Sequence, residues 1–188
     1  DADFKIKVTA GQHLIDGVIT ELNGNTLYVR NENRCNWVRS FANKYTVEIW
    51  APTLSKVSMF GAGTFSTADT LRGADFTCES WNASGTARVM LNTDQCSLFN
   101  HTGNADINAF GFSHQAFVYI NDNGVLNAMG LITDNCYIRS STTGACRVNV
   151  RADLGAEIRS VGNIYYLGGA SNITQEITGT GQLIRVIN

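Results

Sequence analysis

A glycine recurs about every twenty residues over the last two thirds of the chain, and this period restricts the possible folds more than any other feature. Successive members are separated by 22, 18, 21, 20, 18 and 19 residues. A nearly fixed period of this length is typical of repeat proteins, in which each repeat stacks on the one before it. The series comprises Gly63, Gly85, Gly103, Gly124, Gly144, Gly162 and Gly181.

Apolar and polar residues alternate on both sides of these glycines, which indicates strands with one buried face. Ala87 and Val89 follow one glycine at the second and fourth positions, and Cys96 and Leu98 precede the next in the same alternation. A polar turn signal such as Thr93-Asp94 lies about ten residues from each glycine. Each repeat is therefore predicted to contain a strand, a glycine turn, a second strand and a polar turn.

Two short strands per repeat fit either an antiparallel meander or a β-solenoid, in which each repeat forms one coil. The nearly constant period favours the solenoid. We predict an all-β, single-stranded β-helix with about seven or more coils of ~20 residues. It forms one domain over residues 1–188, with irregular N-terminal coils or a cap over 1–53 and regular repeats over 54–188.

The five cysteines are too few for a disulfide scaffold, and their odd number leaves at least one thiol unpaired in a monomer. Cys78 and Cys96 both lie seven residues before a glycine of the series, so we expect them to stack in adjacent coils. A disulfide between them is sterically conceivable at that spacing. The simpler interpretation is that the thiols are buried as small apolar groups.

Composition and charge exclude several function classes. The chain has 14 basic and 16 acidic residues and a net charge of −2, which argues against a nucleic-acid-binding protein. No apolar run approaches the ~18 residues of a membrane-spanning helix. The HxH, HExxH and CxxC spacings of metal and redox sites do not occur, and the glycine pairs lack the lysine of a phosphate loop. We therefore expect no nucleic-acid partner, no transmembrane segment, no metal and no cofactor.

Five short motifs occur in an order and spacing that point to a known family. They are the turn 23–27 (NGNTL), the segment 47–54 (VEIWAPTL), the glycine turn 61–63 (GAG), the segment 166–170 (YLGGA) and the final glycine turn 179–181 (GTG). Over nearly its whole length the chain resembles the putative auto-transporter adhesin head domain, or GIN domain, of Gram-negative cell envelopes. It departs from the family at Ala170, where the family has a proline. The resemblance implies a right-handed β-helix that is secreted or anchored at the envelope, and it carries over no catalytic residues.

Outward-facing aromatic residues provide the best indication of a binding role. If the apolar positions before the glycines point inward, alternation places Phe60, Trp81 and Phe99 on the outside, where we expect them to stack as one stripe. Such a stripe suits the stacking of sugar rings or contact with a protein. The alternative is a register shift of one residue, which would bury all three rings.

Acidic residues at the polar turns form a second candidate site. Asp94, Asp134 and Asp153 would form a column if the turns stack. Stacked carboxylates bind Ca²⁺ in some proteins, and glycan hydrolysis needs two carboxyl groups about 5 to 9.5 Å apart. Ser113-His114 interrupts this column, and aspartate is common in turns, so a structural role is the preferred interpretation. A serine-histidine pair with a distant aspartate does not establish a catalytic triad.

From these features we predict a non-catalytic, adhesin-like binding module of the cell envelope or extracellular space, with a glycan or a surface protein as its partner. A rigid array of repeats presents long faces for multivalent contact. One alternative is a carbohydrate-active β-helix enzyme that uses Asp94 or Asp134. Another is a structural, self-assembling envelope protein that forms homo-oligomers. Any leader or anchor is expected to lie outside this sequence.

Overall fold

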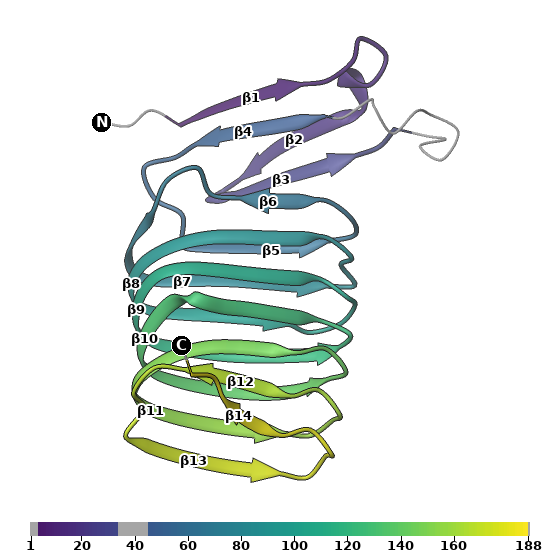
Figure 1. Ribbon diagram of the computed structural model, residues 1–188. Helices are drawn as coiled ribbons and strands as arrows, with labels where there is room; N and C mark the ends of the chain where they lie inside the picture. Colours follow the sequence, from purple (N-terminus) through teal and green to yellow (C-terminus); the bar gives the residue numbers. More distant parts are fainter. Residues whose placement is uncertain (1–3, 34–44, 188) are drawn as a thin grey trace. The chain divides into compact units, whose positions relative to one another are not determined.

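The computed structural model describes residues 4–33 and 45–187, and the chain divides into two compact units, 1–52 and 53–188 (Figure 1). In the first unit, β1 (Lys5–Thr9) pairs antiparallel with β4 (Thr46–Trp50). A 3-10 turn, η1 (Ile15–Gly17), precedes β2 (Val18–Asn23), which pairs antiparallel with β3 (Thr26–Asn31). The predicted turn at Asn23-Gly24 joins β2 to β3, and Gly24 has the positive φ of +57° that favours glycine there. That this unit acts as a cap stays a prediction.

The second unit is a β-solenoid of about six turns, which confirms the predicted fold class with fewer coils than the seven expected. The strands of the first unit, for which the sequence predicts irregular coils or a cap, pair antiparallel among themselves and lie outside the ten-stranded parallel sheet. The described residues contain no α-helix. The strands of the solenoid are β5 (Lys56–Phe60), β6 (Thr64–Ser66), β7 (Leu71–Trp81), β8 (Thr86–Asn100), β9 (Asp106–Asp122), β10 (Val125–Thr142), β11 (Cys146–Ile158), β12 (Ile164–Leu167), β13 (Asn172–Ile177) and β14 (Leu183–Arg185).

The polar turns are bends within long strands rather than breaks between short ones, and Figure 1 shows β8, β9 and β10 as continuous curved ribbons. At each bend a hydroxyl side chain points inward: Thr93, Ser113 and Thr133 are all buried. The Thr93 hydroxyl donates to Ser113 Oγ at 3.1 Å, and the Ser113 hydroxyl donates to the carbonyl of Gln115 at 2.9 Å. These hydroxyl groups therefore provide hydrogen-bond partners for buried polar groups on the inner side of the bend. We call the part of a coil between glycine turn and bend its first limb, and the part after the bend its second limb.

The core lies between the two limbs and consists of columns of apolar residues that stack from coil to coil. One such column, in second limbs, contains Phe76, Cys96, Ala116 and Cys136 in register. The predicted stacking of Cys78 on Cys96 is wrong, because Cys78 pairs with Leu98 instead. Cys78, Cys96, Cys136 and Cys146 are free and buried, and Cys35 lies outside the described residues.

The stacked turns need glycine because a Cβ there would strike backbone atoms of the preceding coil. A Cβ on Gly144 would meet the carbonyl oxygen of Gly124, and one on Gly162 would meet the carbonyl oxygens of Gly144 and Thr142. Gly103 breaks this column: it pairs with Ala83 rather than Gly85 and has a φ of +98°. Counting back from Gly103 therefore displaces Cys96 by two residues, which explains the error about the cysteines.

We predict that Gly162→Ala destabilises the solenoid by about 1–3 kcal/mol, because the added methyl group meets backbone atoms that cannot rotate away. Gly169→Ala is the matched control, since no atom lies within 4 Å of a Cβ at that position. Urea unfolding of the two variants measures the difference. Equal unfolding free energies would show that the glycine turns are not close-packed.

The buried thiols should resist modification in the native protein. Burial raises the pKa of Cys78 to about 12 and the pKa values of Cys96 and Cys146 to about 11, so almost no thiolate forms near pH 8. With Cys35→Ser as background, Ellman's reagent should titrate no thiol within minutes in buffer and all four in denaturant. Rapid reaction of a thiol in buffer would contradict the packing, and a disulfide found by mass spectrometry would contradict the pairing of Cys78 with Leu98.

Candidate ligand-binding face

The cavity found between the two limbs of the solenoid is too small for a ligand. It has a volume of about 10 Å³ and is lined by residues of both limbs, among them Leu98, Ala116, Leu131 and Val148. A space of this size is at the lower limit for a single water molecule. Any ligand of this unit must therefore bind to its outer surface, where the side chains between the core positions point.

Aromatic side chains gather on the outer face of the second limbs. Phe60, Trp81 and Phe99 all point outward, with Phe60 71% and Trp81 39% exposed and Phe99 partly exposed. Phe60 pairs with Trp81 in register, but Phe99 pairs with Glu79 and stands one column nearer the bend. The single stripe expected from the sequence is therefore wrong in register, for the same reason as the cysteine pair: Gly103 is offset by two residues.

The displaced column continues the aromatic surface instead of ending it. Phe99 pairs with Tyr119 in the next coil, and in the column beyond that Phe117 pairs with Tyr137. Going from coil to coil, the rings therefore shift stepwise toward the bend. We call this set the aromatic diagonal; it comprises Phe60, Trp81, Phe99, Phe117, Tyr119 and Tyr137.

Ring contacts join five members of the diagonal into two groups, one around His101 and one formed by Phe117 and Tyr137. His101 stacks on Trp81 with ring centroids 3.8 Å apart and planes 13° from parallel. The same imidazole lies 5.7 Å from Phe99 and 5.9 Å from Tyr119, while Phe117 stacks on Tyr137 at 5.8 Å. The distances of 5.7, 5.9 and 5.8 Å are within the 4.5–7 Å range of favourable aromatic pairs, and the parallel Trp81–His101 stack is closer than that range. His101 therefore bridges the upper and middle parts of the diagonal.

A glycine keeps the far end of the diagonal flat. A Cβ on Gly155 would meet the ring of Tyr137, and Tyr137 is 47% exposed. Phe117, Tyr119 and Tyr137 are not part of the predicted stripe, whose residues lie three or four positions before a glycine of the series. The sequence signal for these residues is the alternation itself, because positions five and seven residues before Gly124, and seven before Gly144, are also expected to point outward.

A partly buried glutamate lies beside the upper rings of the diagonal. Glu79, whose side chain is 14% exposed, accepts hydrogen bonds from Lys56 Nζ at 2.9 Å and Ser58 Oγ at 2.7 Å. Its carboxylate also lies 3.9 Å from His101 Nε2. Burial raises the pKa of Glu79, but the hydrogen bonds from Lys56, Ser58 and the Trp81 indole outweigh it and hold the pKa below its ordinary value. The carboxylate is therefore ionised, held by Lys56 and Ser58 and close to the His101 ring that stacks on Trp81.

The acidic turn column is split by the register. Asp94, His114 and Asp134 follow one another at the bend, whereas Asp153 pairs with Asn135 in the neighbouring column. Asp153 accepts a hydrogen bond of 2.7 Å from the Asn172 amide. The predicted column of three carboxylates is therefore wrong for Asp153. In the described residues, no group of three or more histidine, cysteine or acidic side chains is arranged to hold a metal ion.

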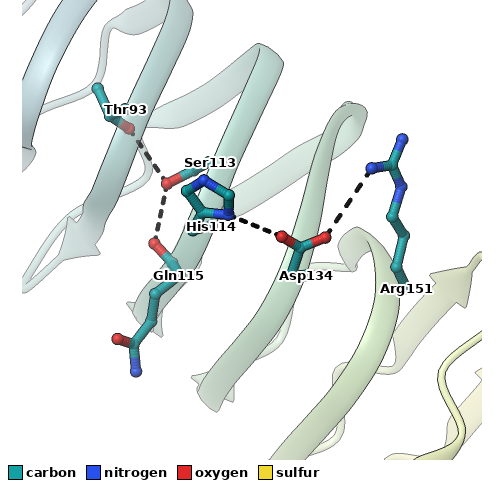
Figure 2. A network of polar contacts seen from close by, with 6 residues as sticks. All are labelled: Thr93, Ser113, His114, Gln115, Asp134 and Arg151. Atoms are coloured by element: carbon teal, nitrogen blue, oxygen red, sulfur yellow. Dashed lines mark hydrogen bonds and ion pairs between the residues drawn. The ribbon is translucent and has the colours of Figure 1, made fainter.

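Figure 2 shows what replaces that column at the bend. His114 Nδ1 lies 2.8 Å from Asp134 Oδ2, and Arg151 lies 3.9 Å from Asp134 Oδ1. Ser113 points the other way, into the core, where its hydroxyl contacts Thr93 and the carbonyl of Gln115. Serine, histidine and aspartate are thus neighbours without forming a triad, since adjacent residues of a strand face opposite sides. His114, Asp134 and Arg151 therefore form a network of polar contacts on the outer side of the bend.

The lowered pKa of Glu79 predicts an acid-sensitive fold. A carboxylate whose pKa is lower folded than unfolded contributes stability above the unfolded value, here 4.5, and that stability is lost as the pH falls through the folded pKa. We expect Glu79→Gln to reduce the unfolding free energy at pH 7 and to flatten its decline below pH 4.5. Urea titrations between pH 7 and pH 3 measure both, with Glu176→Gln on the same face as the control for loss of one carboxylate. An unchanged slope in Glu79→Gln would contradict the lowered pKa of Glu79 in the folded protein.

No helix in the part of the chain that the structure describes is long and apolar enough to cross a membrane.

Comparison with known proteins identifies relatives of the whole fold. The family model described as "Putative auto-transporter adhesin, head GIN domain" matches residues 1–170. Among curated proteins, none matches this sequence.

Solved structures agree with that family match. The crystal structure of a putative adhesin from Bacteroides fragilis superposes with a TM-score of 0.89 at 19% identity, covering 98% of this chain and 84% of that chain. A putative adhesin from Parabacteroides distasonis gives 0.68 at 21% identity, with 97% and 84% covered. A structure from the same organism called a putative lipid binding protein gives 0.63 at 19% identity, with 100% and 86% covered. At these identities the likeness establishes the fold alone.

Proposed function

Because the chain belongs to the family of putative auto-transporter adhesin head GIN domains, we propose that it is a non-catalytic binding module that engages a glycan or a surface protein through the aromatic diagonal. The observation that carries this proposal is the row of exposed and partly exposed rings on one outer face of the solenoid. Exposed aromatic groups of this kind mark interaction sites, because solvation of their surface costs free energy that a partner relieves.

The same family supports a location in the envelope or the extracellular space, where an adhesin meets its partner. A stack of parallel coils suits this role, because each coil is held by backbone hydrogen bonds to its neighbours and the outer rings stay in fixed positions. Preorganised rings lose little conformational entropy on binding. Several equivalent contacts along one face also permit multivalent attachment.

The geometry gives less support to a carbohydrate-active enzyme. A glycosidase needs one carboxylic acid whose pKa is raised so that it remains protonated as the general acid. The carboxyl groups of Glu79 and Glu157 are shifted the opposite way: hydrogen bonds from Arg139 and Arg159 hold the pKa of Glu157 below its ordinary value. Asp134, the acidic residue at the bend, is paired with His114 and Arg151.

The test is a binding and turnover measurement in the same wells. Immobilised polysaccharides and surface glycoproteins are incubated with the wild type, with Trp81→Ala and with Tyr165→Ala, a control that removes an outward ring from a first limb. We expect retained protein without released product, and binding about five- to thirtyfold weaker in Trp81→Ala alone, since a ring that is buried on binding contributes about 1–2 kcal/mol. Product that disappears in Asp94→Ala or Asp134→Ala would instead establish the enzyme.

A further inference from the structure

A column of amide side chains runs beside the lower part of the aromatic diagonal. Gln95, Gln115 and Asn135 stack in register just after the bend, and all three are partly exposed. Two residues along the strand in the same coils stand Phe117 and Tyr137, on the same side of the sheet. Each amide offers two donors and an acceptor. Flat rings therefore lie next to groups that hydrogen-bond in both senses.

This pairing matches the two surfaces of a sugar. A pyranose ring has a C–H face that stacks on an aromatic ring and an edge of hydroxyl groups that both donate and accept hydrogen bonds. A site with correctly placed hydrogen-bonding groups discriminates strongly in favour of hydroxyl-bearing ligands. A lipid chain would use the rings and leave the amides unpartnered.

The diagonal is long and narrow rather than a rounded patch. It crosses five successive coils, from the strand of Phe60 to the strand of Tyr137, and shifts by two columns on the way. Strands lie about 4.8 Å apart and alternate residues about 6.7 Å apart, so the row extends about 23 Å. An extended oligosaccharide of several rings fits such a row, with its chain oblique to the strands.

The charges of this face select against an anionic ligand. Lys56 is paired with Glu79, and Arg139 and Arg159 both contact Glu157. Three cationic side chains stand against five carboxylates, a net charge of −2 with neutral histidine; these are Lys56, Arg139 and Arg159, and Asp75, Glu79, Asp153, Glu157 and Glu176. A polyanion would meet net repulsion there.

From these observations we infer that the ligand of this face is a neutral, extended glycan, whose rings stack along the aromatic diagonal and whose hydroxyl groups are read by Gln95, Gln115 and Asn135. This inference rests on the proposed binding function and specifies the ligand class of the same site. The Phe117–Tyr137 end, where rings and amides lie together, determines which sugar is accepted. The Phe60–Trp81 end adds affinity by stacking alone.

The test uses the whole chain and four kinds of probe on affinity gels. Neutral mannan, xylan and mixed-linkage β-glucan are compared with anionic polygalacturonate and heparin, with phosphatidylglycerol–phosphatidylcholine vesicles, and with surface glycoproteins before and after enzymatic deglycosylation. We expect retention by at least one neutral polysaccharide, little loss of it in salt, and no retention by the vesicles. Size-fractionated fragments of that polysaccharide should bind more tightly as they lengthen, up to about the 23 Å of the row.

Variants locate the ligand on the face. Tyr137→Ala should weaken binding about tenfold and Tyr137→Phe should retain most of it, because the ring rather than the hydroxyl stacks on the sugar. Gln115→Ala should weaken binding without changing the midpoint of urea unfolding. It should also reduce the difference in affinity between the three neutral polysaccharides. Phe112→Ala, an outward ring on a first limb, is the control and should bind as the wild type does.

The possible outcomes distinguish an error in the ligand class from an error in the proposed binding function. Retention only by anionic polysaccharide, by vesicles or by deglycosylated protein, weakened in Trp81→Ala, would overturn the neutral-glycan inference and leave the binding function intact. Binding of neutral glycan that is unaffected by Tyr137→Ala and Gln115→Ala would overturn the assignment of this face. If the folded wild type binds none of the probes, both the neutral-glycan inference and the proposed binding function are contradicted.

Discussion

Parallel pairing between successive coils is the interaction on which the rest of this solenoid depends. It fixes each residue opposite a partner about twenty positions away, so equivalent residues form columns. The consequences are local and strict. Most turns of the series have glycine because a Cβ at that position would strike a carbonyl oxygen of the preceding coil. Hydroxyl residues repeat at the bend because the inward polar groups there need partners.

The same pairing separates the inside of the molecule from its functional surface. With two limbs facing each other, inward positions fill the core almost completely, and the cavity that remains is about 10 Å³. Chemistry is therefore confined to the outward positions, where each coil contributes a few side chains. Ring contacts such as Trp81 on His101, and polar contacts such as those of Glu79 with Lys56 and Ser58, join these side chains to their neighbours in adjacent coils.

Small differences in coil length determine what the surface looks like. Gly103 comes two residues early and pairs with Ala83, so counting from it misplaces both Cys96 and Phe99. The result of this offset is a diagonal rather than a vertical stripe of rings, which ends beside the amide column. The acidic column is split in a similar way, because β10 and β11 shift register between Thr133 and Asn135 and leave Asp153 opposite Asn135.

The sequence by itself left open whether Phe60, Trp81 and Phe99 point outward or into the core, but it determined the repeat, the alternation and the positions of the turns. These follow from local rules: glycine at a close approach, period two along a strand, hydroxyl and acidic residues at bends. Only the tertiary structure decided which residues share a column, that Tyr119 and Tyr137 extend the row, and that Ser113 faces away from His114. Register is a property of the pairing between coils, and an insertion of one or two residues in a turn changes it without altering any local pattern.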